Sequence, residues 1–269
     1  MQLLRFASIY KEAAVSANLH RWAAGIATQA FKQVMGRTPT PAERQIVMAV
    51  SNLESNYGKG WNKGKGNDSH NWGAIQTSNK KAPSFSHQDS SAQGKYNTKF
   101  KKYPDDISGA ADVVRNLFKS NIKQRMPDPN NAYRVWGPSI NGPVRSELIE
   151  MAAQQGDINA FSRAMWYTSY YEGNATDFTE RMKIYSRAIQ KNIDAITSAL
   201  GEQSAWNQKS PGNFLPVTND TSVINQISNM TSSKNINAPI EQKQQPVIEN
   251  VIQKTPAEDT SLENLLWFQ

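Results

Sequence analysis

A single glutamate, Glu54, lies near the end of a predicted amphipathic helix in the stretch SNLESNYGKGW, residues 51–61. It follows Val50 by four residues and Val47 by seven, so it shares a helix face with these apolar side chains. Partial burial and the negative end of the helix dipole would both raise the pKa of its carboxyl group. A carboxyl group that keeps its proton near neutral pH can act as a general acid. Spacing alone leaves open a structural role, in which Glu54 pairs with a buried arginine or caps a loop amide.

Several other reaction chemistries are disfavoured by what the sequence lacks. The chain has no cysteine, which removes thiolate nucleophiles, thiolate metal sites and disulfides. Its three histidines, His20, His70 and His87, form no HExxH motif and no close pair, so a zinc hydrolase is not expected. There is no G-x-S-x-G elbow, and the glycines of residues 58–66 lack P-loop spacing. The sequence therefore favours carboxylate chemistry and gives no reason to expect a metal or an organic cofactor.

Periodicity and capping signals indicate the elements that must position Glu54. Thr40 and Glu43 form a capping box around a proline, which predicts a helix that begins there and ends at Gly58. A hairpin is expected from residues 83–90 and 95–103. Further helical patterns cover residues 3–35, 106–125, 143–155, 157–169 and 177–200. Together they predict a mainly α-helical α+β domain with a small hairpin and loop lobe beside a cleft.

Four short segments follow one another in an order that resembles a known family. They are ESNYG (54–58), NWGAIQ (71–76), TKFKKYPDDISGAADVVRNLF (98–118) and AMWYTSYYEG (164–173). This ordered set is similar to segments of the lysozyme-like superfamily of peptidoglycan-cleaving glycosidases, which includes lytic transglycosylases, muramidases and bacterial endo-β-N-acetylglucosaminidases. The resemblance covers about residues 40–200 and implies an α+β lysozyme-like fold that binds the glycan strand of peptidoglycan.

The resemblance also implies catalytic roles. Glu54 matches the general acid that protonates the leaving glycosidic oxygen. Tyr170 matches the tyrosine beside that acid, with Tyr167 and Tyr171 as alternatives because the run YTSYY leaves the register open. Asp89 is the candidate for a second carboxylate, although its offset departs from the family pattern. Water-mediated hydrolysis and single-acid transglycosylation therefore both remain open.

Substrate-binding residues are expected around the acid. The resemblance implies that Asn71 and Gln76 contact hydroxyl or N-acetyl groups of the sugar. Trp61 and Trp72 are candidate stacking surfaces for sugar rings, although aromatic side chains in a small helical domain commonly belong to the core. Tyr167 is grouped with these substrate-binding candidates.

Composition predicts three parts: an N-terminal helical extension (1–39), a lysozyme-like catalytic domain (40–201) and a flexible polar tail (202–269). The tail is rich in Asn and Gln with scattered apolar residues, which is typical of segments that do not form their own core. It ends in an apolar peptide, Leu262 to Phe268, which could dock on a protein partner. A fraying end, or a helix that folds back on the body, is an equally open interpretation.

Charge is distributed unevenly and bears on the partner. Residues 1–201 hold 26 Lys and Arg against 16 Asp and Glu, whereas residues 202–269 hold four against seven. A basic body suits an anionic envelope polymer, or is a matter of solubility alone. Nucleic acid is disfavoured because the lysines lie in loops without a recognisable binding module.

The predicted function is cleavage of the bacterial cell wall. No stretch reaches transmembrane length and no signal peptide is recognisable. We therefore expect a bacteriophage peptidoglycan glycosidase, carried in the virion or released to the host wall for penetration or lysis. The alternative is a non-catalytic virion structural or glycan-binding protein that retains a lysozyme-like fold.

Overall fold

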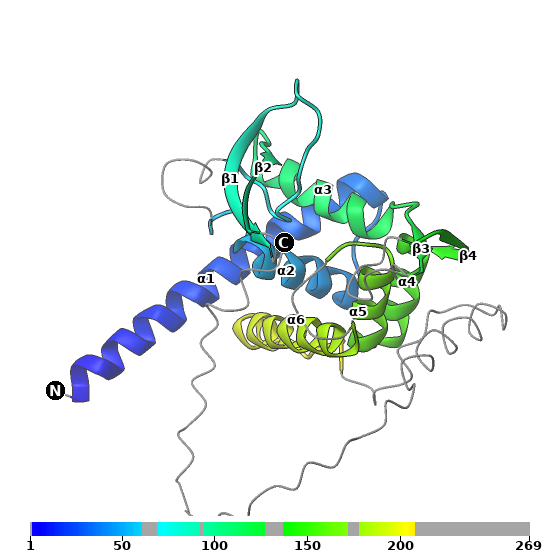
Figure 1. The fold of residues 1–269 in the computed structure, drawn as a ribbon. Coiled ribbons are helices and arrows are strands. Elements are labelled where there is room, and N and C mark those ends of the chain that lie inside the picture. The colour runs from blue at the N-terminus through cyan, green and yellow to red at the C-terminus, as the bar shows by residue number, and fades with distance from the viewer. Residues whose placement is uncertain (1, 61–68, 92–93, 127–136, 172–177, 208–269) are drawn as a thin grey trace, which may run out of the picture.

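The structure is a computed structural model that describes residues 2–60, 69–91, 94–126, 137–171 and 178–207. Its elements, in chain order, are α1 (Gln2–Met35), α2 (Pro41–Ser55), β1 (Ser84–Ser91), β2 (Gly94–Lys101), α3 (Asp106–Phe118), β3 (Lys123–Arg125), β4 (Ser139–Val144), α4 (Arg145–Gln155), α5 (Ile158–Tyr167) and α6 (Phe178–Leu200). Helices α2 to α6 gather against the second half of α1, and the hairpin β1–β2 stands away from them (Figure 1). The predicted class, a mainly helical α+β domain with a small hairpin lobe, is confirmed.

One hydrophobic core includes side chains from all six helices. The apolar stripe predicted for the last helix is buried in it, as shown by Met182, Ile189, Ile193 and Ile196. The second half of α1 contributes small side chains that recur every three or four residues, followed by an aromatic ring; these are Ala23, Ala27, Ala30 and Phe31. Residues 1–39 are therefore not a separate extension, because part of α1 belongs to the same core.

The folded body also continues beyond the predicted boundary at residue 201. Trp206 is buried against Phe161, and its indole N–H donates to the Ala42 carbonyl oxygen at 2.9 Å. The side chain of Gln45 accepts from the backbone N–H of Ala205 and donates to a nearby carbonyl oxygen. Hydrogen bonds to Ala42 and Gln45 thus hold Ala205 and Trp206 against the first turns of α2. The rest of the tail, including Leu262 to Phe268, lies outside the described residues.

Helix α2 begins as predicted. The Thr40 hydroxyl accepts from the Glu43 N–H, and the Glu43 carboxylate accepts from the Thr40 N–H at 2.7 Å, so the capping box is complete. Arg37 donates two hydrogen bonds to the same carboxylate. Burial alone would raise the pKa of Glu43, but the hydrogen bonds from Arg37 and Thr40 outweigh it and lower the pKa.

The end of α2 differs from the prediction. The helix stops at Ser55 because Asn56, Tyr57 and Gly58 all adopt left-handed backbone conformations, with φ of 48°, 56° and 76°. Asparagine tolerates this conformation better than most residues, which explains an end two residues before the tyrosine. The chain therefore reverses immediately after Glu54.

The predicted hairpin is confirmed, whereas a second pair of strands was not predicted. Strands β1 and β2 pair antiparallel, and Phe85 stacks on Phe100 at the base of the hairpin. Strands β3 and β4 form a short irregular pair where the sequence indicated the end of a helix. Helix α3 ends at Phe118 with Lys119 as its C-cap, and the residues that follow, Ser120 and Asn121, are poor helix formers.

Candidate active site

Glu54 lies in the last turn of α2, half-buried, at the point where the chain reverses. The next residue fixes this reversal. The buried hydroxyl of Ser55 accepts from the Gly58 N–H at 2.8 Å and donates to the Trp72 carbonyl oxygen at 2.7 Å. The end of α2 is thereby tied to the segment that contains the predicted motif of residues 71–76.

Two tyrosines, Tyr170 and Tyr185, lie close enough to Glu54 for its charge to act on them. Burial, followed by the negative charge of Glu54, raises the pKa of Tyr170 well above its usual value, and the same two causes act on Tyr185. Both rings therefore stay neutral phenols at physiological pH. Arg145 lies over the Tyr170 ring, with its guanidinium carbon 5.3 Å from the ring centroid. The structure thus places Tyr170 and Tyr185 close to Glu54, with Arg145 against the Tyr170 ring.

Neither added residue gave a distinctive signal in the sequence. Tyr185 falls on the apolar stripe of α6, where a tyrosine looks like an ordinary core residue. Its hydroxyl is nevertheless buried without a hydrogen-bond partner among the described residues. Arg145 is the first residue of α4, where a basic side chain is usually solvated. Only the tertiary structure places Tyr185 near Glu54 and Arg145 against Tyr170.

The backbone around these side chains is strained. Five non-glycine residues in the described chain have positive φ: Asn56, Tyr57, His70, Ala74 and Ser169. Two follow Glu54, two lie in the loop to which α2 is tied, and one immediately precedes Tyr170. Such conformations persist only where surrounding structure holds them, and they cluster at functional sites. These positions therefore mark the turns that fix Glu54, the loop of residues 70–74 and Tyr170.

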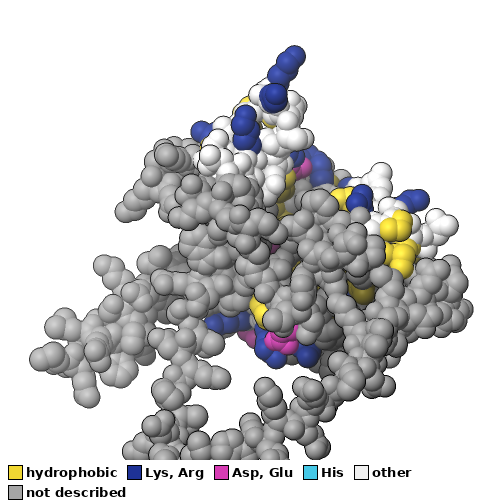
Figure 2. Space-filling model, in the orientation of Figure 1, with side chains coloured by type: hydrophobic (Ala, Val, Ile, Leu, Met, Phe, Trp, Pro, Cys, Tyr) yellow, Lys and Arg dark blue, Asp and Glu magenta, His cyan; other side chains and the backbone are white. Residues whose placement is uncertain are grey.

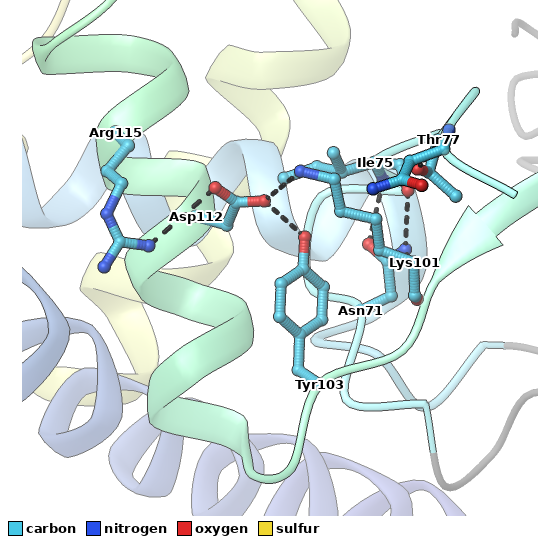
Figure 3. A network of polar contacts seen from close by, with 8 residues as sticks. Asn71, Ile75, Thr77, Lys101, Tyr103, Asp112 and Arg115 are labelled. Carbon is cyan, nitrogen blue, oxygen red and sulfur yellow. Dashed lines mark hydrogen bonds and ion pairs between the residues drawn. The ribbon is translucent and has the colours of Figure 1, made fainter. Parts of the chain in front are cut away.

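Asn71 does not contact substrate, which corrects the sequence-based expectation. Its side chain is fully buried. The amide oxygen accepts from the Ile75 N–H at 2.8 Å, and the amide nitrogen donates to the carbonyl oxygens of Ile75 and Lys101. Figure 3 shows Asn71 between the loop and the end of β2. The residue fixes the loop to the hairpin instead of lining a cleft.

Two aromatic predictions are also corrected. Trp72 is fully buried between Trp22 and Tyr57, and its indole N–H donates to Asp106 at 3.0 Å, so it cannot stack on a sugar. Tyr167 is 1% exposed in the core and cannot bind substrate. A motif match gives the position of such a residue along the chain, but not the direction in which its side chain points.

The remaining predicted site residues have different outcomes. The Tyr171 hydroxyl is hydrogen-bonded to Ser162, so it already has a partner within the core. Gln76 is exposed beside Phe100 and remains available for substrate. Trp61 lies outside the described residues. The backbone of Asp89 pairs with that of Tyr96 in the hairpin, and the Asp89 side chain is outside the part of the chain that the structure describes.

A polar network fixes the hairpin to α3. The Tyr103 hydroxyl and the Lys101 ammonium both donate to one oxygen of Asp112, at 2.5 and 2.8 Å, and Arg115 lies 3.8 Å from the other oxygen (Figure 3). Burial, and then the hydrogen bond and charge of Asp112, raise the pKa of Tyr103 far above its usual value. The strand pair that carries Asp89 is therefore held at a fixed place on the helical body.

Helix α1 braces the segment that follows Glu54. His20 Nδ1 lies 2.8 Å from the Tyr57 hydroxyl, and both side chains are buried. Trp22 packs on Trp72, and the Lys59 ammonium lies 4.5 Å from the centroid of the Trp22 ring. The turn after the candidate acid thus depends on contacts with α1.

The contact of His20 with Tyr57 predicts a pH-dependent stability. Burial lowers the pKa of His20 below its ordinary value of 6.5, so the unfolded chain binds the proton more readily than the folded chain. Stability from this group is complete above pH 6.5 and falls as the pH drops through the lowered pKa of the folded state. Denaturant unfolding at pH 7.5 and 5.0 should show a larger loss for the wild type than for His20→Gln. Equal losses in the two proteins would contradict this role.

Other features of the described residues do not point to a second chemistry. A pocket of about 550 Å³ lies at the opposite end of α2, where it is lined by Arg37, Glu43 and Glu150 among others, and none of the predicted site residues lines it. No cluster of three potential metal-ligating side chains occurs in the described ranges. Among the helices that the structure describes, none has the length and apolar character needed to span a membrane.

Comparisons with known proteins give one similar structure. No family model matches the chain. No curated protein matches it. Among solved structures, the catalytic domain of the autolysin Auto from Listeria monocytogenes is similar, with 18% sequence identity and a TM-score of 0.40 over 68% of this chain and 86% of that one. We therefore infer function from the residues of this chain.

Proposed function

We propose that this protein is a glycosidase that cleaves the glycan strand of peptidoglycan, with Glu54 as its general acid. One observation carries the proposal: the half-buried Glu54 carboxyl group lies close enough to two neutral tyrosines from other elements, Tyr170 and Tyr185, for its charge to raise their pKa values. The ordered sequence motifs around it support peptidoglycan as the substrate. The expected setting is still a bacteriophage protein that acts on the host wall.

The chemistry of each group follows from its surroundings. Tyr170 and Tyr185 remain protonated because their pKa values are raised. Burial lowers the pKa of Arg145 to about 10, so it remains a cation at neutral pH. Among these four side chains, Glu54 is the proposed proton donor, because the two phenols and the guanidinium keep their protons at neutral pH. It donates that proton to the leaving glycosidic oxygen while the sugar develops oxocarbenium character.

Binding of the wall polymer is supported by the charge of the hairpin. Lys80, Lys81, Lys99 and Lys102 are exposed on the hairpin and its base, and Figure 2 shows Lys and Arg side chains gathered there. A basic surface of this kind attracts anionic polymers and increases the rate of encounter. The proposed role of Gln76 is to contact the sugar from the same lobe.

For the second half of the reaction we propose water as the nucleophile, assisted by Asp89. Purified peptidoglycan should be digested with the full chain, and the released muropeptides should be analysed by mass spectrometry. We expect new reducing ends of full mass. Products lighter by one water would show a transglycosylase and remove the role of Asp89. If no new glycan ends form, the glycosidase proposal fails and the non-catalytic alternative is favoured.

A further inference from the structure

We infer that Arg145 positions Tyr170 against Glu54, an inference that rests on the proposed function. Arg145 is 2% exposed, and its guanidinium forms no ion pair with a carboxylate within the described ranges. A buried cation without an acidic partner is unfavourable unless other polar groups surround it. The hydrogen bonds of the Arg145 guanidinium therefore indicate its role.

The guanidinium joins three helices through directed hydrogen bonds. Nε donates to the Thr168 hydroxyl at 2.8 Å, and Nη2 donates to the Thr168 carbonyl oxygen at 2.5 Å. Nη1 donates to the side-chain oxygen of Asn116 on α3. The Thr168 hydroxyl in turn donates to Ala164 within α5. Arg145, at the start of α4, thus fixes the end of α5 and places a positive charge at the negative end of its dipole.

The turn that follows Thr168 needs such support. The Ser169 N–H donates to Trp166 and the Tyr170 N–H donates to Met165, both at 2.9 Å, which is the hydrogen-bond pattern of a Schellman motif. The left-handed position of this motif is usually glycine, but here it is Ser169 with φ of 57°. A residue with a Cβ is less stable in this conformation, so the clamp from Arg145 compensates for it.

The Arg145 guanidinium also contacts Tyr170, the residue that follows this turn. The guanidinium carbon lies 5.3 Å from the centroid of the Tyr170 ring, within the range of a cation–π interaction. Lysine cannot reproduce both the planar fork on Thr168 and the contact with the ring. Arg145 is therefore a positioning residue that acts through Tyr170, and it is not itself a proton donor.

Kinetics of matched variants test this inference. We expect Arg145→Gln to lower kcat by about 10²-fold, because a small misplacement of a catalytic group costs about that much. KM should change little, and Arg145→Lys should not restore the rate. Arg44→Gln is the control, because Arg44 is a hydrogen-bonded arginine at the start of α2, about 15 Å from Glu54 along the helix. The control should keep the wild-type kcat.

Double variants separate positioning from a general loss of stability. In a Tyr170→Phe background, Arg145→Gln should lower kcat much less than in the wild type, because the two residues act as a unit. Ser169→Gly should restore part of the rate lost in Arg145→Gln, because glycine adopts the left-handed conformation without a clamp. Full additivity of Arg145→Gln with Tyr170→Phe would overturn the inference.

Amide hydrogen exchange tests the inference without any activity. In Arg145→Gln the Tyr170 amide, which donates to Met165, should exchange at least about tenfold faster, while the amides of α2 keep their protection. In Arg44→Gln the Tyr170 amide should exchange as in the wild type. Unchanged exchange in Arg145→Gln would refute the positioning role even if the wild type proved catalytically inactive, whereas an inactive wild type with the expected exchange would refute only the glycosidase proposal.

Discussion

Replacing Glu54 with glutamine is expected to reduce peptidoglycan cleavage by roughly 10²- to 10⁴-fold, the range that general acid catalysis contributes. Glutamine keeps the size and hydrogen-bonding shape of the side chain but has no proton to give to the glycosidic oxygen. Because Glu54 is half-buried at a helix end and glutamine has nearly the same size, the fold should be retained. The loss should therefore appear in kcat, with KM nearly unchanged.

Release of soluble muropeptides from purified cell walls measures this effect. Glu180→Gln is a suitable control, because Glu180 lies in the first turn of α6 and its ion pair with Lys183 is solvent-exposed. Both variants should keep the melting temperature of the wild type within about 2 °C, because each replaces a carboxylate by an amide of nearly the same size. A folded Glu54→Gln variant that cleaves at the wild-type rate would refute the assignment of the acid.

The largest expected effect on stability comes from Gly109→Ala. A Cβ atom at Gly109 would lie 1.8 Å from the His70 carbonyl oxygen and 3.0 Å from the His70 carbonyl carbon. The main chain of the loop thus packs directly on α3, and neither backbone can move away without breaking its neighbours' hydrogen bonds. Overpacking of this kind destabilises a core by about 1–3 kcal/mol or more. Displacement of the loop would also pull on Trp72 and Ser55, so cleavage should fall together with stability.

Thermal unfolding of Gly109→Ala and Gly25→Ala provides the measurement and its control. Gly25 lies within α1, and a Cβ there would meet nothing within 4 Å. Alanine is the better helix former, so Gly25→Ala should keep or raise the melting temperature. A Gly109→Ala protein that melts at the wild-type temperature would show that the loop does not need this close approach.

Local signals in the sequence were sufficient for much of the fold. The capping box at Thr40, the hairpin and the apolar stripe of α6 are each encoded within a short segment, and each is present. The contribution of α1 to the core was missed because its buried positions are mainly alanines, which give little contrast with the exposed face. Helix ends were displaced where left-handed residues other than glycine stop the helix.

The candidate site was only partly predictable. Glu54 and Tyr170 lie close together, and each follows from a motif at the end of a helix, Glu54 in the last turn of α2 and Tyr170 in the turn after α5. Asn71 and Trp72 were misassigned because a loop motif does not reveal whether a side chain faces a cleft or the core. Arg145 has no local signature at all, since its role depends on contacts with residues 29 and 23 positions away in sequence.

The contact between Trp206 and Ala42 determines where the folded body can be attached to something else. It fixes the last described segment at the beginning of α2, whereas Glu54 lies 12 residues later in the same helix, about 18 Å away. Anything attached after residue 207 is therefore attached at the far end of the helix that carries the acid. A fusion partner joined directly after residue 207 would therefore begin at that end of α2 and not beside Glu54.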